Sequence, residues 1–182
     1  MKMNKHNKAK IRELSNSMER ILVVVDVQPG YLQICPPRFL KRIHFRVRKA
    51  ALEKKKIVFL EMDTNLRGHT VTNLLQLATA EDKPIVITKR YPDGSPELLQ
   101  TLEANRGSTI FEFCGLYTNA CLKYTLESTF KNGYKTELYA EACSGFGRPG
   151  LEVNRAECQK LFNSWRQSGV KIHNASDTNF CC

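Results

Sequence analysis

Short runs of apolar, β-branched residues alternate along the chain with longer stretches in which apolar residues recur every three or four positions. The short runs are nearly continuous, which is typical of strands buried on both faces of a parallel sheet. The longer stretches are typical of helices with one apolar side. The runs predict six strands, at Ile21–Val27, Ile57–Met62, Pro84–Thr88, Thr109–Phe113, Lys135–Ala140 and Val170–His173.

The segments between these strands predict five helices. Pro36 and Pro37 favour a helix start because they fix φ in its first turn, Ser95 is a suitable N-cap, and Asn132-Gly133 is a typical helix end. The predicted helices run from these prolines to about Lys55 and over Thr70–Ala80, Pro96–Ala104, Thr118–Lys131 and Leu151–Gln167. The alternation predicts an α/β fold with three layers (α/β/α), in which helices cover both faces of a mainly parallel sheet.

Length and cysteine usage indicate one reduced intracellular domain. The chain has 182 residues, enough for one substantial core. We expect a basic N-terminal tail at 1–19, the domain at 20–174 and a loose C-terminal tail at 175–182. An odd number of irregularly spaced cysteines does not suggest a disulfide framework, and no signal peptide is evident, so we expect a cytoplasmic location. The seven cysteines are Cys35, Cys114, Cys121, Cys143, Cys158, Cys181 and Cys182.

The positive charge is concentrated in two segments. The formal net charge is +10, of which residues 1–20 carry +4 and residues 38–56 carry +8. Such a patch can attract nucleic acid or an acidic substrate. We favour a solvated helix face with Leu40, Ile43, Val47 and Ala50 buried beneath it, because no nucleic-acid motif accompanies the charges. We therefore expect at most weak, salt-sensitive nucleic-acid binding.

Three reactive residues follow predicted strands, where active sites of parallel sheets lie. Asp26 ends the first strand, Lys89 follows the third and Cys121 follows the fourth. With Thr118 as the N-cap, Cys121 falls in the first turn of a helix, where backbone N–H groups and the helix dipole favour a thiolate and an oxyanion. Asp26 could accept the thiol proton and return it to a leaving amine. The alternatives are a buried structural cysteine and an Asp26–Lys89 pair that only stabilises the fold.

Three motifs, in this order and spacing, resemble those of the isochorismatase-like cysteine hydrolases, which include nicotinamidases and N-carbamoyl amidases. They are LVVVDVQPGY at 22–31, ITK at 87–89 with the helix that follows, and GLYTNACLKYT at 115–125. The resemblance covers roughly residues 20–145. It implies a Rossmann-like six-stranded sheet of order 3-2-1-4-5-6, a hydrolase activity on a small-molecule substrate and a homo-oligomer.

The resemblance also implies a role for each matching residue. Cys121 is the nucleophile, Asp26 the acid–base group and Lys89 the supporting cation. A cis peptide is implied between Leu116 and Tyr117, so that the N–H groups of Tyr117 and Cys121 form an oxyanion hole. Gln28 and Tyr31 match residues that line the substrate pocket.

The segment after the second strand departs from the pattern of nicotinamidases, which usually carry a metal site there. The sequence reads Glu61-Met62-Asp63-Thr64-Asn65, with only His69 nearby, and this does not supply three ligands. We therefore expect no metal and no other cofactor. The loop at 90–94, after Lys89, is also short compared with that of many relatives.

These observations predict a metal-independent cysteine hydrolase that cleaves a small-molecule amide or related C–N bond through a thioester. An isochorismatase-type vinyl-ether hydrolase is the first alternative, because that reaction needs the acid Asp26 but no nucleophile. A non-enzymatic binding protein that uses the basic helix 38–56 is the second.

Overall fold

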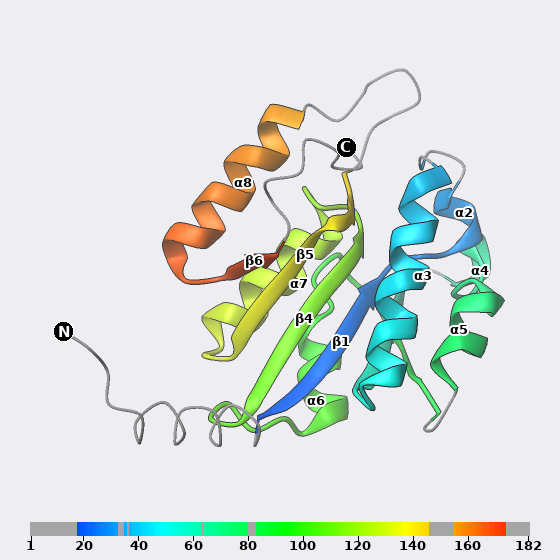
Figure 1. Cartoon of the computed structure of the whole chain (residues 1–182), viewed down its shortest axis with the longest axis horizontal. Coiled ribbons are helices and arrows are strands. Elements are labelled where there is room, and N and C mark those ends of the chain that lie inside the picture. Colours follow the sequence, from blue (N-terminus) through cyan, green and yellow to red (C-terminus); the bar gives the residue numbers. More distant parts are fainter. Residues whose placement is uncertain are drawn as a thin grey trace.

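The computed structural model describes residues 18–32, 35, 37–62, 64–79, 83–145 and 155–173 (Figure 1). Most of the predicted N-terminal tail and the whole predicted C-terminal tail lie outside these residues. The six strands are β1 (Glu19–Val25), β2 (Lys56–Met62), β3 (Ile85–Lys89), β4 (Thr109–Leu116), β5 (Lys135–Ser144) and β6 (Lys171–His173). The helices are α2 (Pro29–Leu32), α3 (Pro37–Leu52), α4 (Thr64–Arg67), α5 (Thr72–Ala78), α6 (Ser95–Leu102), α7 (Cys121–Lys131) and α8 (Arg155–Ser168).

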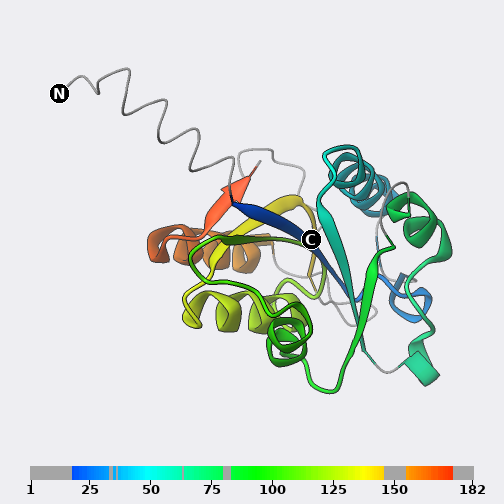
Figure 2. The same cartoon turned by 90° about the horizontal axis from the view of Figure 1, so that it is seen from below.

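All six strands pair in parallel, in the order β3-β2-β1-β4-β5-β6, which confirms the predicted fold class and strand order. Helices α3 and α5 lie on one face of the sheet, and α6 and α7 lie on the other (Figure 2). Helix α8 joins the second group, since Trp165 Nε1 donates a hydrogen bond to Glu127 of α7 at 2.9 Å. The strand order reverses between β1 and β4, so the edge where these two strands end is the expected place for a site.

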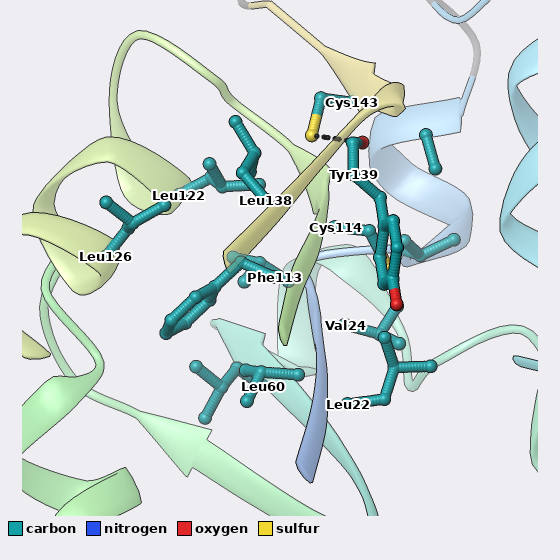
Figure 3. Packing of buried hydrophobic residues seen from close by; sticks show 14 of the residues in the cluster. Leu22, Val24, Leu60, Phe113, Cys114, Leu122, Leu126, Leu138, Tyr139 and Cys143 are labelled. Carbon is teal, nitrogen blue, oxygen red and sulfur yellow. Dashed lines mark hydrogen bonds between the residues drawn. The ribbon is translucent and has the colours of Figure 1, made fainter. Parts of the chain in front are cut away.

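Side chains of the central strands alternate between the two helical layers. Figure 3 shows Phe113 and Leu138 on the side of Leu122 and Leu126, which belong to α7, whereas Tyr139 lies on the opposite side. Strand β1 is apolar on both faces because both faces are covered, as its continuous apolar sequence predicted. The core of the sheet is therefore closed to water, and only the strand ends are available for chemistry.

The predicted boundaries differ from the observed ones where the backbone takes an unusual conformation. Strand β1 ends at Val25, not at Val27, because Asp26 has a left-handed φ of 56°. The N-cap of α6 is Gly94, and Ser95 is the first helical residue, so its assignment as the cap was wrong by one position. The short helices α2 and α4 were not predicted, since four residues are too few for a periodic pattern.

The basic helix α3 lies on the surface with its predicted apolar stripe against the sheet. Ile43 and Val47 are fully buried and Ala50 nearly so, whereas most of the Lys and Arg side chains face solvent. Arg46 is the exception: it is buried, forms an ion pair with Glu141, and stacks 3.9 Å from the centre of the Tyr139 ring. The solvated-face prediction is thus confirmed for the helix as a whole but wrong for Arg46.

Candidate active site

The three predicted reactive residues meet at the carboxyl edge of the sheet. Asp26 directly follows β1, Lys89 ends β3, and Cys121 begins α7 after β4. Asp26 and Lys89 are fully buried, and Lys89 Nζ lies 3.1 Å from Asp26 Oδ2. Cys121 is also buried, at 7% exposed, and its thiol interacts with the Asp26 carboxyl. Segments far apart in sequence are therefore brought together at the point where the strand order reverses.

Close contact between β1 and β4 sets the spacing of this edge. Gly115 has φ +129°, and a Cβ there would lie 2.3 Å from the carbonyl oxygen of Val25. Any side chain would force the two strands apart just before Asp26 and Cys121. Asp26 and Tyr117 both have left-handed φ values, of 56° and 61°. For residues other than glycine this conformation costs on the order of 1 kcal/mol, and it is retained mainly where function or packing requires it.

The turn between β4 and α7 differs from the expected one in two respects. No described peptide bond is cis, so the Leu116–Tyr117 peptide is trans and the predicted cis bond was wrong; the chain reverses through the positive φ of Tyr117 instead. Helix α7 begins at Cys121 after Ala120, and Thr118 is not its N-cap. The Tyr117 carbonyl accepts the N–H groups of Ala120 and Leu122, at 2.8 and 3.1 Å, which makes a side-chain cap unnecessary.

Burial dominates the electrostatics of Asp26. Removal from water raises its pKa, and the positive charge of Lys89 and a hydrogen bond from the Cys121 thiol oppose that rise without cancelling it. Among the described residues no donor with normal hydrogen-bond geometry contacts Asp26 Oδ1. The Cys121 thiol is placed to exchange a proton with this carboxyl. A carboxyl with a raised pKa is suited to hold a proton and release it later.

The surroundings of Cys121 favour its protonated form in the absence of substrate. Burial raises its pKa to about 12, the negative charge of Asp26 adds to this, and Lys89 acts in the opposite direction. Desolvation and a neighbouring carboxylate therefore oppose the thiolate that the helix start favours. The thiol keeps its proton until a base beside it removes it.

Thr125 connects the cysteine helix to the short loop after Lys89. Its hydroxyl donates to the Cys121 carbonyl at 2.8 Å and accepts the N–H of Gly94 at 3.0 Å. Gly94 in turn packs on the Lys89 side chain, and a Cβ there would lie 2.7 Å from Lys89 Cδ. Thr125 therefore helps to fix the position of Cys121 relative to Lys89. Its i, i+4 spacing from Cys121 was a usable signal, although no role was predicted for it.

The two predicted pocket residues differ in their surroundings. Gln28 is fully buried and is bound to backbone by three hydrogen bonds, to the N–H and carbonyl of Met62 and to the carbonyl of Gly68. It therefore fixes the segment after β2, and these contacts occupy its amide. Tyr31 is half-buried, and its ring meets that of Tyr117 edge-on at 4.9 Å. Burial raises the pKa of both tyrosines and the charges of Asp26 and Cys121 add to this, so the pair lies close to the reactive residues.

Within its described residues, the segment after β2 offers few ligands for a metal site of the nicotinamidase type. Glu61 is buried and already accepts the Thr70 N–H at 2.5 Å, while its other oxygen lies 3.0 Å from His69 Nδ1. The described residues hold no group of three or more His, Cys, Asp or Glu side chains that could bind a metal, and Asp63 lies outside them. Two potential ligands, one of them committed to the backbone, do not supply the three that such a site needs.

None of the described helices is long and apolar enough to span a membrane. Solved structures similar to this chain include the MAR1 ribonuclease of Caenorhabditis elegans, with 18% identity and a TM-score of 0.68 over 85% of this chain and 76% of that one. The nicotinamidase of Staphylococcus aureus matches with 21% identity and a TM-score of 0.65, over 85% and 99%. YcaC of Escherichia coli, described as an octameric hydrolase of unknown specificity, matches with 13% identity and a TM-score of 0.68, over 85% and 74%.

At these identities the structural matches establish the fold alone. Comparison with curated protein sequences finds no significant match. The family model of the isochorismatase domain, however, matches residues 20–172, which is most of the chain. This chain is therefore an isochorismatase-family hydrolase.

Proposed function

We propose that this protein is a cysteine hydrolase that cleaves a C–N bond in a small amide without a metal ion. The observation that carries the proposal is the buried arrangement of Cys121, Asp26 and Lys89 at one sheet edge, with the thiol beside the carboxyl. A nucleophile next to a base that is itself oriented by a third group is the recurring arrangement for covalent catalysis.

In the proposed reaction, Asp26 accepts the Cys121 proton as the sulfur adds to the amide carbonyl carbon. The carbonyl oxygen becomes an oxyanion, which we expect the N–H of Cys121 to bind. The C–N bond then breaks, and Asp26 returns its proton to the leaving amine. Water adds to the thioester and releases the acid and the thiol. Lys89 keeps the carboxyl oriented and favours its ionised form during the first step.

A panel of small amides, with ammonia release as the readout, tests this proposal. The wild-type protein should hydrolyse at least one amide, and Cys121→Ala should abolish turnover while the far-UV spectrum is unchanged. Cys143→Ala is the matched control: that thiol is also buried, but it donates to the Tyr139 carbonyl at 3.2 Å and has no proposed role (Figure 3). Cleavage of a vinyl ether, measured by release of its carbonyl product, that survives in Cys121→Ala but is lost in Asp26→Asn would support the vinyl-ether alternative, since that reaction needs only the acid.

A second candidate, nucleic-acid binding, is favoured by one exposed aromatic on α3. Phe45 is 60% exposed, and its neighbours on the outer face of the helix are the basic residues Arg38, Lys41, Arg48 and Lys49. An aromatic ring among cations is a platform on which unpaired bases can stack. One ring supplies little binding energy, so we expect weak binding to a single-stranded oligonucleotide that falls steeply with salt in a gel-shift titration. Tight binding of the oligonucleotide at high salt would favour nucleic-acid binding over catalysis as the function of this protein.

We also expect a homo-oligomer in a reducing, cytoplasmic setting. Several apolar side chains remain exposed outside α3, namely Leu66, Val86, Tyr91 and Tyr124, and a partner subunit would cover such positions. The proposed nucleophile requires a reduced thiol.

A further inference from the structure

A cavity lies at the amino edge of the sheet, where β1 begins and α3 ends (Figure 1). Residues at the starts of β1, β2 and β3 line it, together with the ends of α3 and α5. Its volume is about 650 Å³, which is within the range of pockets that hold small molecules. The reactive residues lie at the carboxyl ends of the strands, so this cavity, which we call the basic pocket, is separate from the proposed active site.

Cations outnumber carboxylates in the lining of the basic pocket. Its cations are Arg20, Lys54, Lys55, Lys56 and Lys83, and its carboxylates are Glu19 and Glu53. Lys56 pairs with Glu19 at 2.7 Å, and Lys55 pairs with Glu53 at 2.8 Å. Arg20 and Lys55 also share the buried Glu112, and the cations remain in excess when this carboxylate is counted. The side chains of Lys54 and Lys83 are exposed. The pocket therefore keeps a net positive charge.

The backbone at Lys54 is a second observation on the same pocket. Lys54 follows α3 with a left-handed φ of 55°. Its N–H donates to the Ala51 carbonyl, and the N–H of Lys55 donates to the Ala50 carbonyl, both at 3.0 Å. This is the Schellman arrangement of a helix end, in which the left-handed position is usually glycine. Lysine takes this conformation at a cost in stability that glycine avoids, and what it supplies in return is a cation in the lining of the pocket.

We propose that the basic pocket binds a small molecule that carries a chain of two or more phosphate groups. Lysine binds phosphate as a point charge, and several phosphate groups can each accept hydrogen bonds from a different ammonium group. The volume of the cavity suits a small ligand. Its lining also includes the apolar side chains of Ile57, Ala78 and Ile85, which can contact an uncharged part of the same molecule.

Isothermal titration calorimetry with tripolyphosphate and with ATP tests this proposal on the full chain. Each probe should bind at one molecule per chain, and added salt should weaken the binding. Inorganic phosphate should bind more weakly than either, because a single group reaches fewer of the cations. The two probes also separate the possible ligands. Tighter binding of ATP supports a nucleotide, with its ring against the apolar side chains, and equal binding supports a ligand recognised by its phosphate chain alone.

Lys54→Gly is the most informative variant, because it removes a charge from the pocket and relieves the backbone at the same time. The affinity for tripolyphosphate should fall about fivefold, which is the upper end of what an exposed ion pair contributes. The midpoint of thermal unfolding should not fall, since glycine takes a positive φ without steric cost. Lys54→Arg should keep the affinity. Lys41→Gln is the matched control, because it removes an exposed cation near the other end of α3, outside the pocket, and its affinity should equal that of the wild type.

Three results would overturn the proposal. The first is the absence of binding of both probes to the wild type at low salt. The second is an equal loss of affinity in Lys41→Gln and Lys54→Gly, which would indicate attraction by the overall positive charge of the chain. The third is binding of a single-stranded oligonucleotide that Lys54→Gly weakens while tripolyphosphate does not compete, which would assign these cations to nucleic acid. The amide assay of Cys121 is a separate measurement, so the cysteine hydrolase proposal is unaffected by any of these results.

Discussion

Two clusters of buried charge in this molecule are built differently. The first lies on the α3 face of β4 and β5, where the buried carboxylates Glu112 and Glu137 are bridged by Arg20. Glu112 also accepts two hydrogen bonds from Lys55, at 2.9 and 3.0 Å, and Glu137 lies 2.7 Å from His173 Nε2. Each carboxylate in this cluster has several cationic partners.

The second cluster is the proposed site, where Asp26 has one cation, Lys89, and an oxygen without a donor of normal geometry. The pKa values follow this difference. Burial alone would raise the pKa of Glu137, but the hydrogen bond from His173 and the charge of Arg20 outweigh it and lower the pKa. Burial raises the pKa of Asp26 despite Lys89. A carboxylate whose oxygens all accept hydrogen bonds from cations stays ionised. A carboxylate with few donors that lies beside a thiol can exchange a proton with it.

Asp26→Asn gives the largest expected difference between the two clusters. An amide cannot accept the thiol proton or return it, so amide turnover should fall about 10³-fold. Glu137→Gln, the matched change in the other cluster, should leave turnover within about twofold and lower stability only modestly. Ammonia release and urea unfolding measure the two effects. Equal losses of turnover in both variants would mean that Asp26 acts through the fold and not through chemistry.

The same Asp26→Asn variant should increase the alkylation of Cys121 by iodoacetamide at pH 8, because this reagent reacts with the thiolate already present in solution equilibrium and needs no proton transfer to Asp26 during the attack. The negative charge of Asp26 raises the pKa of Cys121, so its removal lowers that pKa and increases the thiolate fraction. In the wild type the rate should climb with pH up to 10 without levelling, because the pKa is about 12. A plateau below pH 9, or slower alkylation in the variant, would contradict the arrangement of charges described here.

Removal of one lysine from each cluster should affect stability unequally. Lys89→Met leaves Asp26 buried without a counter-charge and should lower the free energy of unfolding by about 3–5 kcal/mol. Lys55→Met leaves Arg20 on Glu112 and should cost about 1 kcal/mol. Urea denaturation at pH 7 compares them. A larger loss of stability in Lys55→Met than in Lys89→Met would contradict this account.

Chelation should have the smallest effect. Of the residues that the structure describes after β2, only Glu61 and His69 are potential ligands, fewer than the three that are needed, and we therefore expect dialysis against a chelator to leave amide turnover unchanged. A large loss that zinc or manganese restores would refute metal independence. Turnover should be assayed before and after dialysis in the same preparation.

The fold could be predicted because its signals are local and repeated. The continuous apolar run at β1 and the helical stripe of α3 each specify an element directly, and together with the other elements they specify a parallel sheet. Asp26, Lys89 and Cys121 could be located for the same reason, since each follows a strand and parallel strands end at a common edge.

The remaining features depend on packing between segments that are distant in sequence. The left-handed φ of Tyr117 replaces the expected cis peptide, and the expected Thr118 cap gives way to the Tyr117 carbonyl. The raised pKa of Cys121 depends on its distance from Asp26 and on burial, neither of which is encoded by its place at a helix start.

Acyl transfer from p-nitrophenyl acetate tests the central claim most directly, because it requires no knowledge of the natural substrate. After brief incubation, acid quenching and peptide mass spectrometry, the account predicts an acetyl group on Cys121 as a thioester, which decays as water hydrolyses it. Cys121→Ala should lose the label, whereas Cys143→Ala should keep it. Acetylation confined to other cysteines or to lysines, with Cys121 unmodified in the folded wild-type protein, would contradict the assignment of Cys121 as the nucleophile.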